Sequence, residues 1–270
     1  MDYEKTGYLT EDYKFFHIKD RSDRKYGFHY HDFYKIILFL KGHVSYNVEG
    51  KNYELKPLDL ILVGRNEIHR PVVDPEAEYE RFVLYLSDTF LSQKISSTLS
   101  LKDCFYKSSK EHINVLHLSS HDTTELNGIL QRMEEKEGAS EYGSDADERL
   151  LLLEFLIKLN ESIEKNGISF TGKVAYSETI VSVSEFINAH LNEDLSLERL
   201  SKIFNVSRYH LMRLFKECTG YTIHQYIIEK RILYTKKLAD GGEKIKDACV
   251  KAGFKDYTMY LRAKNKHDRK

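Results

Sequence analysis

The order of apolar and polar residues in the first third of the chain predicts β-structure. Short runs rich in β-branched and aromatic residues alternate with turn residues, at 34–40, 43–55, 58–63 and 79–86. In the second of these runs, Val44, Tyr46 and Val48 alternate with polar residues up to a turn at Glu49-Gly50. A period of two that is interrupted by such a turn is typical of a β-hairpin. Several short strands of this kind favour a small barrel or a sandwich.

The middle of the chain changes to the period of a helix. One helix is expected over 123–138, where Leu126, Ile129, Leu130 and Met133 share a face. A second is expected over 145–167, and its apolar residues (150–153, 155–157 and 159) form a stripe wider than one core contact needs. Two interpretations stay open: the helix covers both the barrel and a second copy of the chain, or it is one deeply buried helix.

The last third is helical throughout. It follows a polar segment at 165–178 that contains two glycines and that we interpret as a linker. The expected helices span 178–191, 196–205, 207–218, 222–239, 244–252 and a last stretch from about 256. The sequence has no proline in this part, as unbroken helices require.

Two of these helices have the pattern of a helix-turn-helix unit. Ser196 can cap the first and Ser207 the second, with a break at Asn205-Val206. The second helix carries two stripes of equal spacing, one apolar (Leu211, Leu214, Phe215, Cys218) and one basic and aromatic (Tyr209, Met212, Arg213, Lys216). Arginine can pair with guanine O6 and N7 in the major groove, and lysine reaches phosphate. An ordinary helical hairpin with a solvated basic face has the same pattern, so this unit alone leaves both interpretations open.

A second unit of the same plan favours DNA binding. Residues 243–267 contain a short helix (Ile245, Ala248, Ala252), a turn at Gly253-Phe254, and then Tyr257, Thr258, Leu261 and Arg262 at the earlier spacing. The helix between the units, 222–240, would be about 28 Å long, near the ~34 Å of one DNA turn. The two units could therefore enter successive major grooves.

The charge distribution agrees with this interpretation. Residues 171–270 contain 19 Lys+Arg and 12 Asp+Glu, a net of +7, whereas the first 170 residues contain 22 basic and 30 acidic residues, a net of -8. A basic part beside an acidic part suggests a polyanion-binding module joined to another domain. Three widely spaced cysteines, with no signal peptide and no membrane-spanning run in the sequence, lead us to expect a reduced, cytoplasmic setting.

The C-terminal residues resemble the AraC/XylS family of transcription regulators over about 178–264. The motifs that carry the resemblance are "DLSLERLSKIFNVSRYHLMRLFKECTGYTIHQYIIEKRILYTKKLA" and "IKDACVKAGFKDYTMYLRA". The resemblance places DNA-facing positions at Arg208, Tyr209, Met212 and Arg213, beside the Lys216 of the basic stripe, and at Tyr257, Thr258 and Arg262. One departure concerns the end of the chain, where Lys264 and Asp268 stand at positions that usually hold large aromatic residues. We therefore expect a weaker, frayed second unit.

The first half resembles the cupin-type ligand barrel of many such regulators, over "GFHYHDFYKIILFLKGHVSYNVEGKNYELKPLDLILVGRNEIHRP" (27–71). His29, His31 and His69 fall where metal-binding cupins place ligands, but Lys35 stands where that pattern requires a glutamate. A cation at this position argues against a metal. We expect the three histidines, with Tyr46, Arg65 or Glu67, to bind a small polar effector, and the family suggests a sugar. The alternative is that they are satisfied polar groups at the barrel mouth.

The sequence thus predicts an α+β protein of two domains. A cupin-like β-barrel with a helical dimerisation segment spans 1–165, a linker 166–177, and an all-α domain with two helix-turn-helix motifs 178–270. The predicted function is a ligand-responsive, DNA-binding transcription regulator that is not an enzyme and uses no cofactor. Its expected partners are double-stranded DNA, a small-molecule effector, a second copy of the chain and RNA polymerase, with no membrane. The rivals are a metal-dependent cupin enzyme fused to a DNA-binding domain and a regulator that senses no ligand.

Overall fold

The computed structural model describes residues 9–21, 26–136, 142–167 and 174–268. Its first half contains two antiparallel sheets. The larger has the strand order β1 (Tyr13–Asp20), β7 (Tyr79–Leu86), β2 (Tyr34–Lys41), β5 (Leu60–Val63) and β8 (Val115–Leu116). The smaller has the order β6 (His69–Val73), β3 (Val44–Val48), β4 (Lys51–Glu54) and β9 (Val174–Tyr176).

The expected strands are present, and the sequence interpretation missed others. The hairpin of β3 and β4 turns at Glu49 (φ 47°) and Gly50 (φ 86°), and two positive φ angles in a two-residue loop match the right-handed twist of the strands. β1, β6, β8 and β9 were not expected. β6 contains Pro71, which it tolerates because it lies at the edge of its sheet. β9 lies inside the segment that we interpreted as an irregular linker.

The barrel interior is the space between the two sheets. Alternate residues of β2 face opposite sides: Ile37 and Phe39 pack into the interior, whereas Ile36 and Leu38 pack outward. The interior cluster also includes Val44, Tyr46, Val48, Tyr53, Ile61, Val63, Tyr79, Val83 and Val115, all buried. Lys35 has the same parity as Ile37 and therefore faces the interior.

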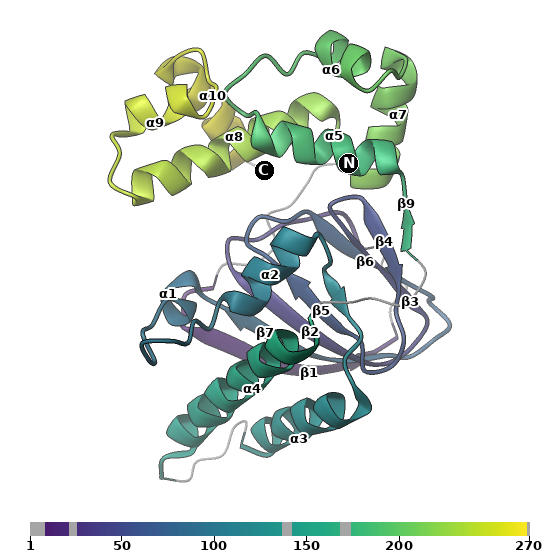
Figure 1. The fold of residues 1–270 in the computed structure, drawn as a ribbon, viewed down its shortest axis with the longest axis vertical. Coiled ribbons are helices and arrows are strands. Elements are labelled where there is room, and N and C mark those ends of the chain that lie inside the picture. Colours follow the sequence, from purple (N-terminus) through teal and green to yellow (C-terminus); the bar gives the residue numbers. More distant parts are fainter. Residues whose placement is uncertain (1–8, 22–25, 137–141, 168–173, 269–270) are drawn as a thin grey trace.

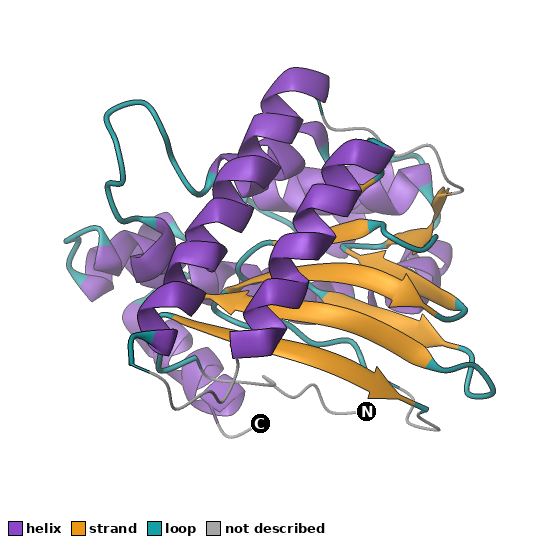
Figure 2. Ribbon diagram, turned by 90° about the horizontal axis from the view of Figure 1, so that it is seen from below, coloured by secondary structure: helices purple, strands orange, loops and turns teal. Residues whose placement is uncertain are grey.

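Helices cover the outer face of the larger sheet. They are α1 (Asp88–Leu91), α2 (Asp103–Glu111), α3 (Ser120–Lys136) and α4 (Ser144–Asn166). Figure 2 shows α3 and α4 side by side across the strands. Leu152 and Phe155 of α4 are fully buried in this intramolecular core, so they are not the dimer contact that the broad stripe suggested. The residue of the stripe that remains open is Leu150, with 63% of its surface exposed.

The second half is a helical domain, as the sequence predicts. It comprises α5 (Glu178–Ala189), α6 (Leu197–Ile203), α7 (Arg208–Thr219), α8 (Ile223–Asp240), α9 (Ile245–Lys251) and α10 (Tyr257–Asp268). Both expected caps are confirmed, because Ser196 Oγ accepts from Arg199 N and Ser207 Oγ from His210 N, each at 3.3 Å. A capping box of Thr222 and Gln225 starts α8.

The helical domain rests on one end of the barrel, and α3 and α4 lie at the opposite end of the molecule (Figure 1). Phe28, Tyr30 and Ile68 of the barrel belong to the same apolar core as buried residues of α5, α7 and α8. The ring of Phe28 lies against the backbone of Gly220, where a Cβ atom would overlap it. This close docking of the two domains was not predicted from the sequence.

Candidate nucleic-acid interface and effector site

The outer face of α7 carries the basic and aromatic residues that the sequence singled out. Leu211 and Phe215 are fully buried on the inner face. On the outer face, Tyr209 is 75% and Met212 46% exposed, and Arg208, Arg213 and Lys216 are also exposed. Within the described part of the chain, the sole ion pair of Arg213 is a loose one with Glu217, at 3.9 Å on the same helix. The guanidinium is therefore available to a ligand.

A cavity of about 490 Å³ borders this face of α7. Three segments line it: Tyr209, Met212, Arg213 and Lys216 of α7, Thr222, Ile223, His224 and Ile227 at the start of α8, and Leu195, Ser196 and Leu197 at the start of α6. Backbone N–H groups at the start of a helix favour anions. Sequence reasoning missed His224, although its position just after the Thr222 cap was a usable signal.

The second motif is better anchored than the sequence suggested. Tyr260 and Phe254 are buried with Ile232 and Cys249, and their rings meet edge to face at 5.5 Å. This packing anchors α10 although Lys264 stands where the family usually has a large aromatic residue. Lys264 itself is half-buried. Of the residues expected to contact DNA in this motif, Thr258 and Arg262 are exposed. Tyr257 is half-buried, and its ring centroid lies 6.0 Å from that of Tyr260. The Asp268 side chain lies outside what the structure describes.

Three histidines meet at the barrel end that faces the helical domain. We name His29, His31 and His69 the histidine cluster. The ring centroids of His29 and His69 are 4.3 Å apart, and those of His31 and His69 are 4.8 Å apart. The backbones of His29 and His69 form a β-bridge, and the Tyr46 ring stacks on His69 at 6.0 Å. The structure thus brings together four of the six residues that the sequence analysis proposed for the effector.

Backbone carbonyls orient every ring of the histidine cluster. The Nδ1 atoms lie 3.0 Å from Gly27 O for His29, 2.7 Å from Phe33 O for His31 and 2.9 Å from Glu67 O for His69. Burial and then Lys35 lower the pKa of His29 to about 4. Burial also holds the pKa of His31 and of His69 well below the ordinary value. The cluster is therefore neutral at physiological pH.

The other two expected effector residues have different partners. Arg65 is exposed, donates from Nε to Asp32 O at 2.7 Å and pairs with Asp88. The Glu67 carboxylate accepts from Gly64 N at 2.7 Å and from Asn114 Nδ2 at 3.0 Å. Within the described residues, no contact joins either side chain to the histidine cluster. These contacts indicate that both residues brace loops.

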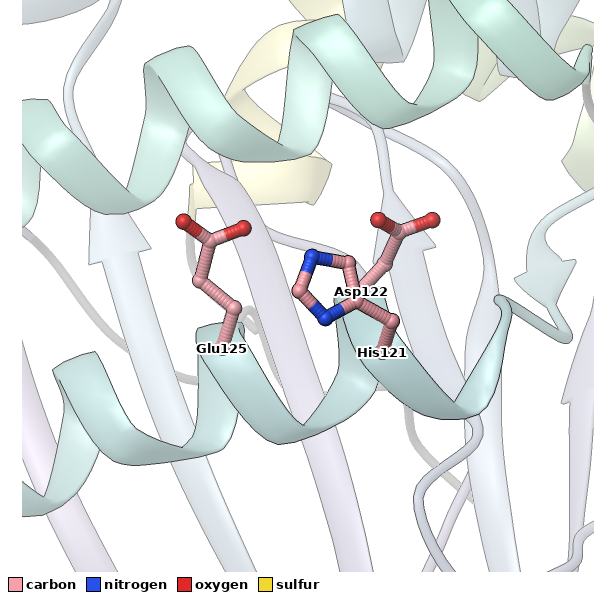
Figure 3. A group of neighbouring side chains, drawn as sticks. All are labelled: His121, Asp122 and Glu125. Carbon is pink, nitrogen blue, oxygen red and sulfur yellow. The ribbon is translucent and has the colours of Figure 1, made fainter.

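The histidine cluster is not the tightest group of potential metal ligands. In the described ranges, the group with ligand atoms within 4.8 Å of one another is His121, Asp122 and Glu125 at the start of α3. In Figure 3, both carboxylates point away from α3. They already have partners on α4, because Asp122 accepts from Ser162 at 2.8 Å and Glu125 pairs with Lys158 at 3.4 Å. This group joins α3 to α4.

We expect the barrel to contain no stoichiometric metal when purified. Burial lowers the pKa of all three histidines, the charge of Lys35 lowers each of them further, and that charge would oppose a divalent cation at the same place. Elemental analysis of the purified protein checks this. Near-stoichiometric zinc, iron, nickel or manganese that is lost in His31→Ala would contradict the expectation.

Comparisons with known proteins match each half of the chain to a domain family. Residues 13–153 match the AraC-like ligand binding domain, and residues 200–267 match a helix-turn-helix domain. The chain belongs to the AraC family of transcription regulators.

Its relatives include regulators of similar length. The chain is 27% identical to the HTH-type transcriptional regulator YbfI of Bacillus subtilis (strain 168), over 86% of this chain and 80% of that protein. It is 24% identical to the lactose operon transcription activator of Staphylococcus xylosus, over 89% and 83%. A solved structure of unsaturated fatty acid bound ToxT from Vibrio cholerae covers 94% of this chain and 92% of that chain, at 16% identity and a TM-score of 0.39. That level of likeness says nothing of what this AraC-family chain binds.

These relatives are transcription regulators and not enzymes. The family assignment therefore confirms the predicted α+β architecture of a ligand-binding domain followed by a DNA-binding domain. Among the described helices of this AraC-family regulator, none combines the length and the hydropathy that crossing a bilayer requires.

A carboxylate joins the two domains of the regulator. Glu49, in the β3–β4 turn, accepts from Tyr226 Oη at 2.7 Å, Lys230 Nζ at 2.6 Å and Ile68 N at 2.9 Å. The Glu49 and Lys230 side chains are 19% and 13% exposed. Tyr30 Oη adds a hydrogen bond to Glu229, at 3.0 Å. No periodicity in the sequence distinguishes Glu49 from an ordinary turn residue.

Proposed function

We propose that the chain is a cytoplasmic, homodimeric regulator that binds double-stranded DNA and responds to a small polar effector at the histidine cluster. The observation that carries the DNA-binding part is the exposed basic and aromatic face of α7, which lies opposite an apolar face whose Leu211 and Phe215 are fully buried. Arg213 reads a base, Tyr209 and Met212 contact neighbouring base edges, and Arg208 and Lys216 hold phosphates. His224 adds a phosphate contact at the start of α8.

We expect Arg213→Ala and Lys216→Ala to weaken DNA binding in different ways. Without the two hydrogen bonds that the Arg213 guanidinium can donate to one base, the free energy of binding to the preferred site should weaken by about 1–3 kcal/mol. The preference at that base pair should relax as well. Loss of the lysine should weaken all sequences alike and reduce the salt slope by about 1. Titrations on specific and scrambled duplexes across salt concentrations measure both effects.

The matched control for these titrations is Arg132→Ala, which removes an exposed arginine of α3 at the other end of the molecule. It should leave both duplexes unaffected. Equal losses on the two duplexes for Arg213→Ala would show that Arg213 does not read a base.

In the second motif, Arg262→Ala should reduce sequence preference less than Arg213→Ala does, because the basic residues near the end of the chain favour contact with phosphates.

The effector part of the proposal rests on the position of the histidine cluster. His69 follows Ile68, whose backbone N–H and C=O both bond to Glu49, and Glu49 in turn holds Tyr226 and Lys230 of α8. A molecule that moves His69 therefore acts directly on the contact between the domains. It controls DNA binding only to the extent that it prefers one arrangement of the domains over the other. The relative named for a lactose operon supports an effector rich in hydroxyl groups.

We expect the exposed apolar side of α4 to contribute to the homodimer. Leu150, Leu153 and Ile157 lie at helical spacings of three and four, and Leu150 is largely exposed while the other two are half-buried. Leu150→Asp should shift sedimentation equilibrium toward the monomer mass without lowering the melting temperature, because the side chain has no core role. Tyr106→Asp, on exposed Tyr106 of α2, is the control. An unchanged mass for Leu150→Asp would place the dimer contact elsewhere.

A further inference from the structure

Three buried polar atoms at the barrel end have no hydrogen-bond partner among the described residues. They are Nε2 of His31, Nε2 of His69 and Oη of Tyr46. All three side chains are at least 98% buried. An unsatisfied buried polar group costs about 1–3 kcal/mol, so three in adjacent rings are costly unless a ligand completes them.

The hydrogen bonds of the rings determine what this ligand must offer. Each Nδ1 faces a backbone carbonyl oxygen and therefore carries the proton. Because the rings are neutral, each Nε2 presents a lone pair and can only accept. The groups that complete it are hydroxyl or amine donors, whereas a bare carboxylate offers no donor at all.

Lys35 adds a positive charge beside these acceptors. It faces the interior opposite Tyr85, and its ammonium lies 5.6 Å from the centre of that ring. Burial and then the neighbouring Arg81 lower the pKa of Lys35 to about 7, and no carboxylate contributes to this shift. Arg81 already has an anionic partner, because it donates to Asp20 at 2.7 Å. Near neutral pH this half-buried amine is therefore protonated in about half of the molecules, and among the described residues no anion pairs with it.

We propose that the effector is a small carboxylate that carries several hydroxyl groups, of the class of sugar acids and hydroxy acids. This inference rests on the proposed function and names the chemistry of the same site. The carboxylate pairs with the Lys35 ammonium, two hydroxyl groups donate to Nε2 of His31 and of His69, and Tyr46 Oη bonds to a further ligand oxygen. A neutral sugar would leave Lys35 unpaired, and an unsubstituted fatty acid would leave both histidines unsatisfied.

Binding to the full-length protein tests this proposal. The probes are gluconate, galactonate, glucuronate and galacturonate, each compared with its parent aldose, the methyl esters of the two uronates, and hexanoate. At least one sugar acid should bind in calorimetry and raise the melting temperature, whereas its neutral parent, its ester and hexanoate should not. Lys35→Met should weaken that binding about 100-fold, because it removes the cationic partner of the proposed charge pair.

Tyr46→Phe is the second variant, and we chose it because it is expected to fold normally. Because Tyr46 Oη has no partner among the described residues, its removal should leave the melting temperature of the free protein unchanged or higher while it weakens sugar-acid binding about tenfold. The charge-matched control Lys51→Met removes a lysine of β4 whose ammonium bonds to His112 O instead. It should leave binding unchanged.

Each alternative result overturns the proposal in a recognisable way. A neutral sugar that binds wild type and Lys35→Met alike would show a neutral effector, and the proposed regulator would stand. Hexanoate binding that survives His31→Leu would remove the requirement for hydroxyl groups. Binding of none of these probes would reject the class, and the separate DNA titrations of Arg213→Ala would still decide whether the chain is a DNA-binding regulator.

Discussion

Glu49→Ala is expected to weaken the docking of the two domains by about 2–4 kcal/mol. Removing one partner of a largely buried ion pair leaves the other charge without compensation, here Lys230, and the phenol of Tyr226 loses its acceptor at the same time. Hydrogen exchange should therefore speed up at the barrel end, around Ile68, and at the start of α8. Denaturant unfolding should change from one transition toward two, because each domain keeps its own apolar core.

The double variant Glu49→Ala/Lys230→Met separates charge from packing. It removes the stranded ammonium and should recover part of the loss, so the two single changes should not add. Glu80→Ala, which removes a carboxylate of β7 away from the interface, is the control. If Glu49→Ala leaves exchange at Ile68 and α8 unchanged, the apolar contacts of Phe28, Tyr30 and Ile68 hold the domains without the charge pair.

The functional meaning of the Glu49 contact follows from its neighbours. The same carboxylate that holds α8 also bonds to the backbone of Ile68, next to His69 of the histidine cluster. In the proposed regulator, Glu49→Ala should therefore reduce the effect of a bound effector on DNA affinity, whatever the sign of that effect. An effector acts at a distance only through a difference between two states of the protein, and the Glu49 contact connects the proposed effector site to α8.

Periodic features of the sequence predicted the structure well. The helix-turn-helix face could be located because Leu211 and Phe215 recur at helical spacing and the polar positions between them must then point outward. The grouping of His29, His31 and His69 came from the family resemblance, since no local period connects residues 40 positions apart. Short strands such as β8 and β9 were missed because two or three residues carry too little pattern to be distinguished from loops.

The contacts between elements could not be predicted from the sequence. Glu67 and Arg65 belong to the same loop as His69 and were expected to share its ligand, but side-chain direction sends them to Asn114 and Asp32. Likewise, most of the broad apolar stripe of α4 packs against the sheet and α3 of the same chain. An apolar stripe in the sequence predicts that this face of the helix is buried, but it does not identify the element that buries it.

Gly253→Ala is expected to destabilise the second motif by about 2–5 kcal/mol. Gly253 has φ +95° in the turn before α10, and an alanine in left-handed backbone costs about 1–2 kcal/mol. A Cβ atom there would also overlap the carbonyl oxygen of Leu191 and crowd Arg231 Nε, which bonds to that oxygen at 2.8 Å. Backbone cannot yield as a flexible side chain does, so this overlap adds about 1–3 kcal/mol.

Gly242→Ala provides the control, because Gly242 has the same φ of +95° and a Cβ atom added to it would meet no described atom within 4 Å. It should show the backbone strain alone, so the difference between the two variants isolates the contact with Leu191. In a footprint, Gly253→Ala should lose protection of the half-site proposed for α10 and keep that proposed for α7, since the apolar core around Phe215 is separate from the one around Tyr260. Equal melting temperatures for the two variants would show that the α9–α10 turn can move away from Leu191.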